Sequence, residues 1–351
     1  MLNKQEIREL VAAHGAAVNE GRPIRQLIED GDLSRLRGCT VLEGKVSDSV
    51  FGDGLRAASS GNPIRLMFRN NRISTHDVNR GAIPFKDQVL AFNHDHMLRL
   101  VKAVLGTSQF EVEGLSPAST VIPAENLDLV KLENVLRLYM AESSTSTSLY
   151  QHWLAAKEEG QSVLQYAGHN LAVAELEPNG RLPYLMDTPS TKEAVDRTID
   201  AGYLIESGIC TEGQYAQIRN SSLMGFGLVS HHLARKGMVL VDTKTEHGIN
   251  ADGRIVAADE LYTMDSSRFW KLDDQGDLLT RNGKPVSFSK EFARGMVKEK
   301  GQQFSEEEAE QIAIRYIQGL QHITGETFAP DLRPRDQRIV DSTNLILDAL
   351  L

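Results

Sequence analysis

Cysteine is scarce in this chain. Only two cysteines occur in 351 residues, Cys39 and Cys210, and they lie far apart in the sequence. Two isolated thiols form neither a disulfide framework nor a metal-binding pattern. The sequence therefore excludes a small disulfide-stabilised scaffold, and a reducing cytoplasm is the simplest compartment for the protein.

Long apolar runs and an excess of positive charge are also missing. No apolar segment approaches the roughly 20 residues that a helix needs to span a bilayer, and charged residues interrupt the N-terminal segment where a signal peptide would carry an apolar core. We therefore expect no membrane association and no secretory signal. The formal net charge of −10 argues against a nucleic-acid partner, because phosphate backbones require a basic surface. A local basic pocket for one small phosphorylated ligand is still allowed.

The rest of the composition is that of a globular protein, with 41% hydrophobic and 25% charged residues. The spacing of apolar residues predicts helices before residue 40, strands after it, and a long helix over about 211–237. Ser305 and the acids after it predict another helix start, whereas 161–192 reads as irregular. Runs of strands followed by helices favour an α+β fold over a doubly wound sheet.

Charge is concentrated in an expected hairpin over 239–270. Asp242, Lys244 and Glu246 occupy alternate positions of its first strand, so they share one face. An Asn-Ala-Asp-Gly turn follows, and the returning strand brings Asp259 or Glu260 back toward them. Converging carboxylates suit Mg²⁺, and the lysine between them suits a phosphate. A solvated face with weak cross-strand ion pairs is the alternative.

Other segments carry groups that suit an anion. Arg268 follows two serines, and its planar guanidinium matches a carboxylate or a phosphate. Arg137 precedes a Ser/Thr run that opens a helix, where backbone N–H groups favour negative charge; a simple N-cap is the alternative. Lys45 follows a glycine bend without P-loop spacing. Asp77 and Lys192 lie in polar loops, "RNNRISTHD" and "TPSTK", for which ordinary surface turns are the alternative.

Five of these segments, in this order, resemble the SAICAR synthetase (phosphoribosylaminoimidazole-succinocarboxamide synthase) family: "GKV.D", "RIS..D", "R.Y.A.S", "TPSTK" and "VDTK.E.G…G.I…DE…DSSRFW". The likeness covers about residues 41–330. It implies a two-lobed α+β fold with a helical C-terminus. A β-rich N-terminal lobe (41–130) would pack on a larger α+β ATP and substrate lobe (131–351), after a helical extension (1–40) that the resemblance leaves unexplained.

The resemblance implies an ATP- and Mg²⁺-dependent ligase that joins the carboxylate of carboxyaminoimidazole ribotide to the amine of L-aspartate through an acyl phosphate. Its partners would be small molecules, and assembly into a homo-oligomer stays open. Two alternatives are a diverged ligase acting on another carboxylate or amine in specialised nucleoside biosynthesis, and a nucleotide-binding regulatory protein without turnover. The carboxylates of the hairpin disfavour the regulatory protein, because a pure binder has little need of metal ligands.

Carried over by position, the resemblance implies several sets of site residues. The expected ATP contacts are Lys45, Val46, Lys244, Glu246 and Asp259. The expected Mg²⁺ ligands are Glu246 and Asp259. The expected substrate contacts are Arg137, Ser143, Arg268, Asp77 and Lys192. The expected catalytic residues are Lys244, Asp259 and Arg268.

Several positions depart from the usual pattern of the family. Phe85, Lys86 and Asp87 stand where "GKG" is usual, which adds bulk and negative charge where a glycine loop should approach a ligand. Glu142 replaces the glycine before Ser143. Thr245 and His247 replace the two aromatics of "KFEFG", and Leu138 replaces the glycine of "RG". The phosphate and metal groups are therefore better kept than the substrate loops.

Overall fold

The computed structural model describes residues 1–75, 78–145, 147–193, 196–297, 299 and 301–351. The chain forms two compact units, and each combines segments that are distant in the sequence. Unit 1 contains Met1–His96, Ser108–Leu127 and Ser289–Leu351, and unit 2 contains Met97–Thr107 and Asp128–Phe288. The units are thus not successive segments, because the C-terminal helices belong with the first helices.

Unit 1 is built on a small antiparallel sheet with strand order β1-β2-β3-β6. Its strands are β1 (Thr40–Leu42), β2 (Ser47–Arg56), β3 (Pro63–Arg69) and β6 (Val121–Glu125), and a separate hairpin joins β4 (Arg72–Thr75) to β5 (Val78–Ala82). Val50, Leu66 and Phe68 project from the sheet into a core that Ile339 and Leu347 complete from the last helix. Burying these apolar side chains contributes roughly 25 cal/mol per Å² to stability.

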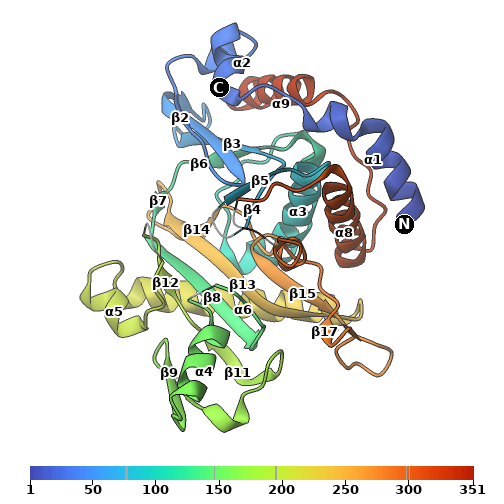
Figure 1. Ribbon diagram of the computed structural model, residues 1–351. Helices are drawn as coiled ribbons and strands as arrows, with labels where there is room; N and C mark the ends of the chain where they lie inside the picture. The colour runs from blue at the N-terminus through green and yellow to red at the C-terminus, as the bar shows by residue number, and fades with distance from the viewer. Residues whose placement is uncertain (76–77, 146, 194–195, 298, 300) are drawn as a thin grey trace. The chain divides into compact units, whose positions relative to one another are not determined.

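Helices complete unit 1. They are α1 (Lys4–Asn19), α2 (Ile24–Asp30), η1 (Ser34–Leu36), α3 (Lys86–Leu105), which continues into unit 2, η2 (Pro117–Ser119), α7 (Glu291–Arg294), α8 (Glu306–Thr324) and α9 (Arg335–Leu350). The predicted start of α8 is confirmed, since Ser305 and Glu308 form a capping box. The segment "NKQEIRELVAAHG" predicts a helix that ends near Gly15, but α1 runs to Asn19, and a Cβ at Gly15 would meet Pro84 at the ordinary contact distance of 3.4 Å. Figure 1 shows α1 beside α8.

Unit 2 contains an antiparallel sheet with the path β11-β8-β13-β14, to which β7, β12 and β15 add at the sides. The strands are β7 (Asp128–Leu129), β8 (Leu132–Tyr139), β11 (Arg181–Asp187), β12 (Ser190–Thr191), β13 (Met238–Ile249), β14 (Ile255–Ala258) and β15 (Ser267–Lys271). The predicted long helix is α6 (Glu212–Ala234), which packs on β13 and β8 (Figure 1). Shorter elements are α5 (Ala201–Glu206), β16 (Thr280–Arg281) and β17 (Lys284–Pro285). The predicted α+β class is confirmed.

Residues 161–192 are not irregular, contrary to the sequence-based expectation. They include the hairpin of β9 (Val163–Tyr166) and β10 (His169–Ala172), the short η3 (Val173–Glu175), and then β11 and β12. Ala167 and Gly168 both have positive φ, 51° and 81°, which is the backbone of a tight two-residue hairpin turn. The apolar side chains of this hairpin pack on Trp153 of α4 (Leu149–Glu158).

No described helix is both long and apolar enough to cross a membrane.

Candidate functional site

The predicted hairpin is β13 and β14, and one face of β13 carries the charged side chains. The register shifts between Leu240 and Asp242, so the regular alternation begins at Asp242. From there Lys244 and Glu246 follow on the same face. Thr245 faces the other way, where its Oγ1 lies 3.5 Å from the Ser222 hydroxyl of α6. The predicted sharing of one face is confirmed for these three charged residues.

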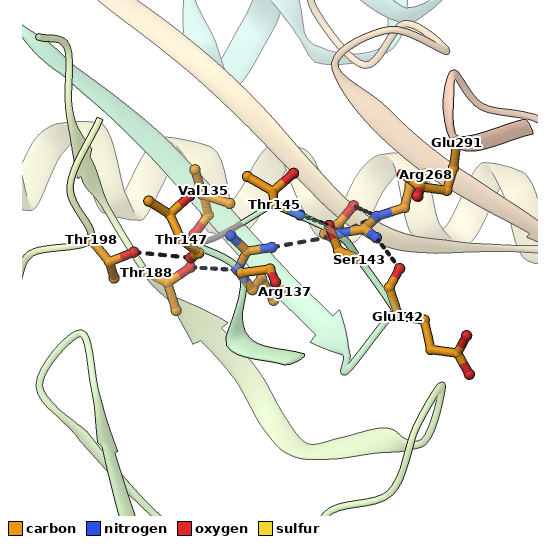
Figure 2. Close-up of polar contacts among 12 residues, drawn as sticks. Val135, Arg137, Glu142, Ser143, Thr145, Thr147, Thr188, Thr198, Arg268 and Glu291 are labelled. Atoms are coloured by element: carbon orange, nitrogen blue, oxygen red, sulfur yellow. Dashed lines mark hydrogen bonds and ion pairs between the residues drawn. The ribbon is translucent and has the colours of Figure 1, made fainter. Parts of the chain in front are cut away.

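Asp242 joins two arginines that come from the strands on either side of β13. Arg268 of β15 donates from Nε to Oδ1 at 2.9 Å and from Nη2 to Oδ2 at 2.5 Å. Arg137 of β8 donates from Nη1 to Oδ2 at 3.3 Å and from Nε to the Thr188 hydroxyl at 3.1 Å (Figure 2). Two guanidinium groups share one buried carboxylate, so these three side chains together carry a formal charge of +1. Such a group suits an anionic substrate.

The Glu142 side chain does not enter this arginine pair. Its backbone carbonyl accepts a hydrogen bond from Arg268 Nη1 at 3.3 Å, while its carboxylate accepts from Asn179 Nδ2 at 3.1 Å and lies 3.9 Å from Lys284 Nζ. Figure 2 shows the carboxylate pointing away from Arg268. The carboxylate of Glu142, which stands where the family has a glycine, is therefore paired with Asn179 and Lys284 and not with the two arginines. Ser143, the next residue, is buried.

The Ser143 hydroxyl lies in the turn that leads into α4. Its Oγ accepts the backbone N–H of Thr145 at 3.2 Å, and Ser148 caps the helix by accepting from Gln151 N. Arg137, a Ser/Thr turn and the N-terminus of α4 thus follow one another along the chain, which is the arrangement expected for an anion site.

Lys244 lies between carboxylates. Its Nζ is 2.5 Å from Glu133 Oε1 and 3.4 Å from Glu246 Oε1, while Glu246 Oε2 pairs with Lys192. Burial lowers the pKa of Lys244, but the negative charges of Glu133, Glu246 and Asp259 outweigh it and raise the pKa well above its usual value. Burial raises the pKa of Glu246, yet the two ammonium groups bring it below the ordinary value. Lys244 and Glu246 are therefore both charged at neutral pH.

Asp259 follows β14 directly and is not inside the returning strand as the sequence suggested. Glu246 pairs in register with Ala258, so the chain brings Asp259 next to the charged face. Asp259 is exposed and has a φ of 56°, a left-handed conformation that non-glycine residues adopt rarely and that often occurs at functional sites. Its charge acts on Lys244.

Glu246 and Asp259 fit a Mg²⁺ site by their chemistry. Mg²⁺ takes carboxylate oxygens together with water and substrate phosphates rather than a full protein cage. Both oxygens of Glu246 contact ammonium groups, so Mg²⁺ would take the place of one of these contacts. Within the described parts of the chain, no cluster of three or more His, Cys, Asp or Glu side chains forms a metal site by itself.

Lys45 lies in unit 1, in the turn between β1 and β2, and its side chain is exposed. Gly44 is required there because a Cβ would lie 2.3 Å from the Ser47 carbonyl oxygen. Asp48 and Arg72 fasten the turn: Arg72 Nη2 lies 2.6 Å from Asp48 Oδ1 and donates to the Gly44 carbonyl at 2.8 Å. This fixed backbone presents Lys45 to solvent.

Val46 and Asp77 were also expected to contact ATP or the substrate. Val46 is half-buried, and its carbonyl accepts the Asn70 N–H at 2.9 Å, so its backbone is fixed by β-type pairing. Asp77 lies outside the described residues.

Phe85, Lys86 and Asp87 are buried in unit 1, which corrects the idea that they add bulk to a ligand loop. Phe85 has a φ of 62°, a glycine-like conformation, and its ring packs edge-on against Phe328 at 5.9 Å. Asp87 Oδ2 lies 2.8 Å from Arg338 Nη2, with both side chains at most 1% exposed. Lys86 is fully buried. The side chains that replace the usual glycines are therefore packed in the core of unit 1.

Glu133 and Thr188 contact the charged residues of this face but were not expected at the site, whereas Asp242 was expected on the face without its role of pairing two arginines. The alternation of Glu133 and Arg137 along β8 is a period-two signal that places both on one face. The sequence contained that signal, but it did not contain the pairing of β8 with β13.

Comparisons with known proteins agree with the motifs. The sequence pattern of the SAICAR synthetase family matches residues 58–311. The chain is 32% identical over 299 residues to the chloroplastic phosphoribosylaminoimidazole-succinocarboxamide synthase of Arabidopsis thaliana, covering 81% of this chain and 69% of that protein.

Solved structures show the same fold. The SAICAR synthase from Saccharomyces cerevisiae complexed with SAICAR superposes with a TM-score of 0.68 at 19% identity, over 89% of this chain and 99% of that one. A type-2 SAICAR synthetase in complex with ADP superposes with a TM-score of 0.59 at 21% identity, over 83% of this chain and all of that one. This chain belongs to the SAICAR synthetase family.

Proposed function

We propose that this chain is an ATP- and Mg²⁺-dependent carboxylate–amine ligase that joins carboxyaminoimidazole ribotide to L-aspartate, in the cytoplasm and as part of purine biosynthesis. The observation that carries the proposal is the charged face of the unit 2 sheet. It combines an arginine pair for anionic substrates with a lysine and carboxylates suited to phosphate and metal. Family membership and the relatives complexed with SAICAR and with ADP support it.

The chemistry explains why such a face is needed. A carboxylate oxygen is a poor leaving group, so the carboxylate first takes the γ-phosphoryl group of ATP and releases ADP. The aspartate amine then attacks the carbonyl carbon of the acyl phosphate, phosphate leaves, and the nitrogen loses a proton to give the amide. In each step negative charge lies on phosphate or carboxylate oxygens, and cations held in place beforehand stabilise it.

The residues take distinct roles in this proposal. Lys244 and Lys45 meet the ATP phosphates, and Val46 contacts the nucleotide. Glu246 and Asp259 hold Mg²⁺, which screens phosphate charge. Arg137, Ser143 and Arg268 bind substrate carboxylates or phosphate, with Lys192 and Asp77 as further substrate contacts.

A direct assay tests the function. The purified chain with ATP, Mg²⁺, the carboxylated ribotide and aspartate should release ADP and form the succinocarboxamide product. Omitting either substrate should stop ADP release. Absence of product from this pair, with turnover of another carboxylate or amine, would replace the proposed substrates. No specific feature of the described structure favours such a second function.

A further inference from the structure

Of the two carboxylates that contact the Lys244 ammonium, Glu133 is closer than Glu246. The family motifs described above do not include Glu133. Its Oε1 lies 2.5 Å from Lys244 Nζ, and its side chain is only 13% exposed. Thr245 pairs in register with Asn134, so continuing the antiparallel register places Glu133 opposite Glu246. Two like charges at facing positions of neighbouring strands repel each other. The ammonium of Lys244, between the two carboxylates, removes that repulsion.

The contacts around Lys244 form a chain that runs from Ser190 through Glu133, Lys244 and Glu246 to Lys192. The Ser190 hydroxyl of β12 lies 3.5 Å from Glu133 Oε2, because Ser190 pairs in register with Glu133. Lys192 lies two residues after Ser190, and its Nζ pairs with Oε2 of Glu246. Glu133, Lys244, Glu246 and Lys192 thus alternate acid and base along this chain of contacts, and their two carboxylates and two ammonium groups sum to zero formal charge. Removing Glu133 would leave Lys244 with its longer contact to Glu246, at 3.4 Å.

We propose that Glu133 is a positioning residue that fixes the Lys244 ammonium on the sheet face, where it meets a phosphate oxygen of ATP. This inference rests on the proposed ATP-dependent function. An ammonium has three N–H donors. Glu133 and Glu246 direct two of them, which sets the direction of the third. A lysine side chain is flexible, and the two carboxylates remove that freedom before the nucleotide binds, which lowers the entropic cost of the phosphate contact.

A positioning role differs from metal binding in what it predicts. Glu133 acts through Lys244, so its removal should matter only while that lysine is present. A metal ligand would instead change how much Mg²⁺ the reaction needs, whatever residue stands at position 244. The Lys244 contact on Oε1 and the serine near Oε2 favour positioning.

The test is a double-mutant cycle on the full chain, read by ADP release. The variants are Glu133→Ala, Glu133→Gln, Lys244→Ala and the double alanine variant, with Glu175→Gln on exposed η3 as a matched control. We expect Glu133→Ala to lower kcat by about 10- to 100-fold with little change in the KM for aspartate. Glu133→Gln, which keeps an acceptor oxygen, should recover part of that loss. In the Lys244→Ala background, Glu133→Ala should cost nothing further.

Other outcomes overturn the inference. Wild-type kcat in Glu133→Ala, losses that simply add in the double variant, or a raised Mg²⁺ requirement in Glu133→Gln would each remove the positioning role. If Glu133→Ala does not fold, as judged by circular dichroism, the cycle is run with Glu133→Gln, which keeps the shape of the side chain. A wild-type chain that releases no ADP would refute the proposed function instead.

Discussion

Asp242 binds Arg268 through both carboxylate oxygens, at 2.9 Å to Nε and 2.5 Å to Nη2, in the two-point geometry that arginine and carboxylate favour. Arg137, from the opposite neighbouring strand, contacts the same carboxylate at 3.3 Å. One acid therefore sets the spacing of two guanidinium groups, which would otherwise repel each other. This spacing is what a substrate carboxylate or phosphate would meet.

Asp242→Asn should separate the two arginines. The amide keeps the shape of the side chain but removes its charge, so the guanidinium groups lose their common counter-ion. We expect kcat/KM for the anionic substrates to fall by about 10- to 100-fold, which corresponds to about 1.4–2.7 kcal/mol of transition-state stabilisation. Asp128→Asn on β7, at an exposed position of the same sheet, is the control. Steady-state ADP release measures both, and equal rates would show that Asp242 is dispensable.

Lys244→Ala should lower kcat for ADP release by about 100-fold, to a rate that can still be measured, while the chain stays folded. Removing a cation aimed at a developing phosphate charge typically costs about 100-fold or more in kcat. The neighbouring Glu133 and Glu246 would also lose their counter-ion, so a small drop in melting temperature is expected. Lys131→Ala, at an exposed position just before β8, provides the control. An unchanged kcat in Lys244→Ala would remove the hairpin from the mechanism.

His247 should make the stability of the chain sensitive to acid. It is 1% exposed, neither ring nitrogen has a hydrogen-bond partner within the described structure, and burial lowers its pKa to about 4. An unfolded chain takes up the proton near pH 6.5, but the folded chain does not until about pH 4. The contribution of His247 to the free energy of unfolding is thus fully present above pH 6.5. It falls by about 3 kcal/mol as the pH drops to 4.

His247→Phe, which restores the aromatic residue usual in the family, should remove that pH dependence. Urea unfolding of the metal-free wild-type chain and the variant at pH 7.5 and pH 5 measures the difference. At pH 5 the variant should gain about 2 kcal/mol relative to the wild-type chain, because the phenyl ring does not titrate. An unchanged difference between the two pH values would mean that His247 is protonated or hydrogen-bonded in solution.

Arg338→Met should destabilise unit 1 strongly. It leaves the Asp87 carboxylate buried without its cation, which typically costs about 3–5 kcal/mol. Adding Asp87→Leu should recover most of that loss, since a buried pair and two apolar side chains of similar size are often of equal stability. Guanidinium unfolding of the single and double variants tests this. Two losses that add would show that the residues do not act as a pair.

The sequence alone determined the parts of this protein that depend on local periodicity. Alternation along β13 predicted that Asp242, Lys244 and Glu246 share a face, and the turn after it predicted that Asp259 returns beside them. The Ser305 cap predicted the start of α8. The family motifs predicted the fold, because their identity and order can be read directly from the sequence without knowing which residues are in contact.

Only the tertiary structure decided which strands lie next to β13. The contact of Glu133 with Lys244 joins residues 111 positions apart, and that of Arg137 with Asp242 spans 105. No local pattern specifies such a register. The sequence also could not show that Phe85, Lys86 and Asp87 are buried, because charged residues are usually exposed. The cation that pairs with Asp87 is Arg338, 251 positions later in the chain. The spacing of residues in the sequence predicted which charged side chains share a strand face. Long-range strand pairing and core packing determine which of those side chains are in contact.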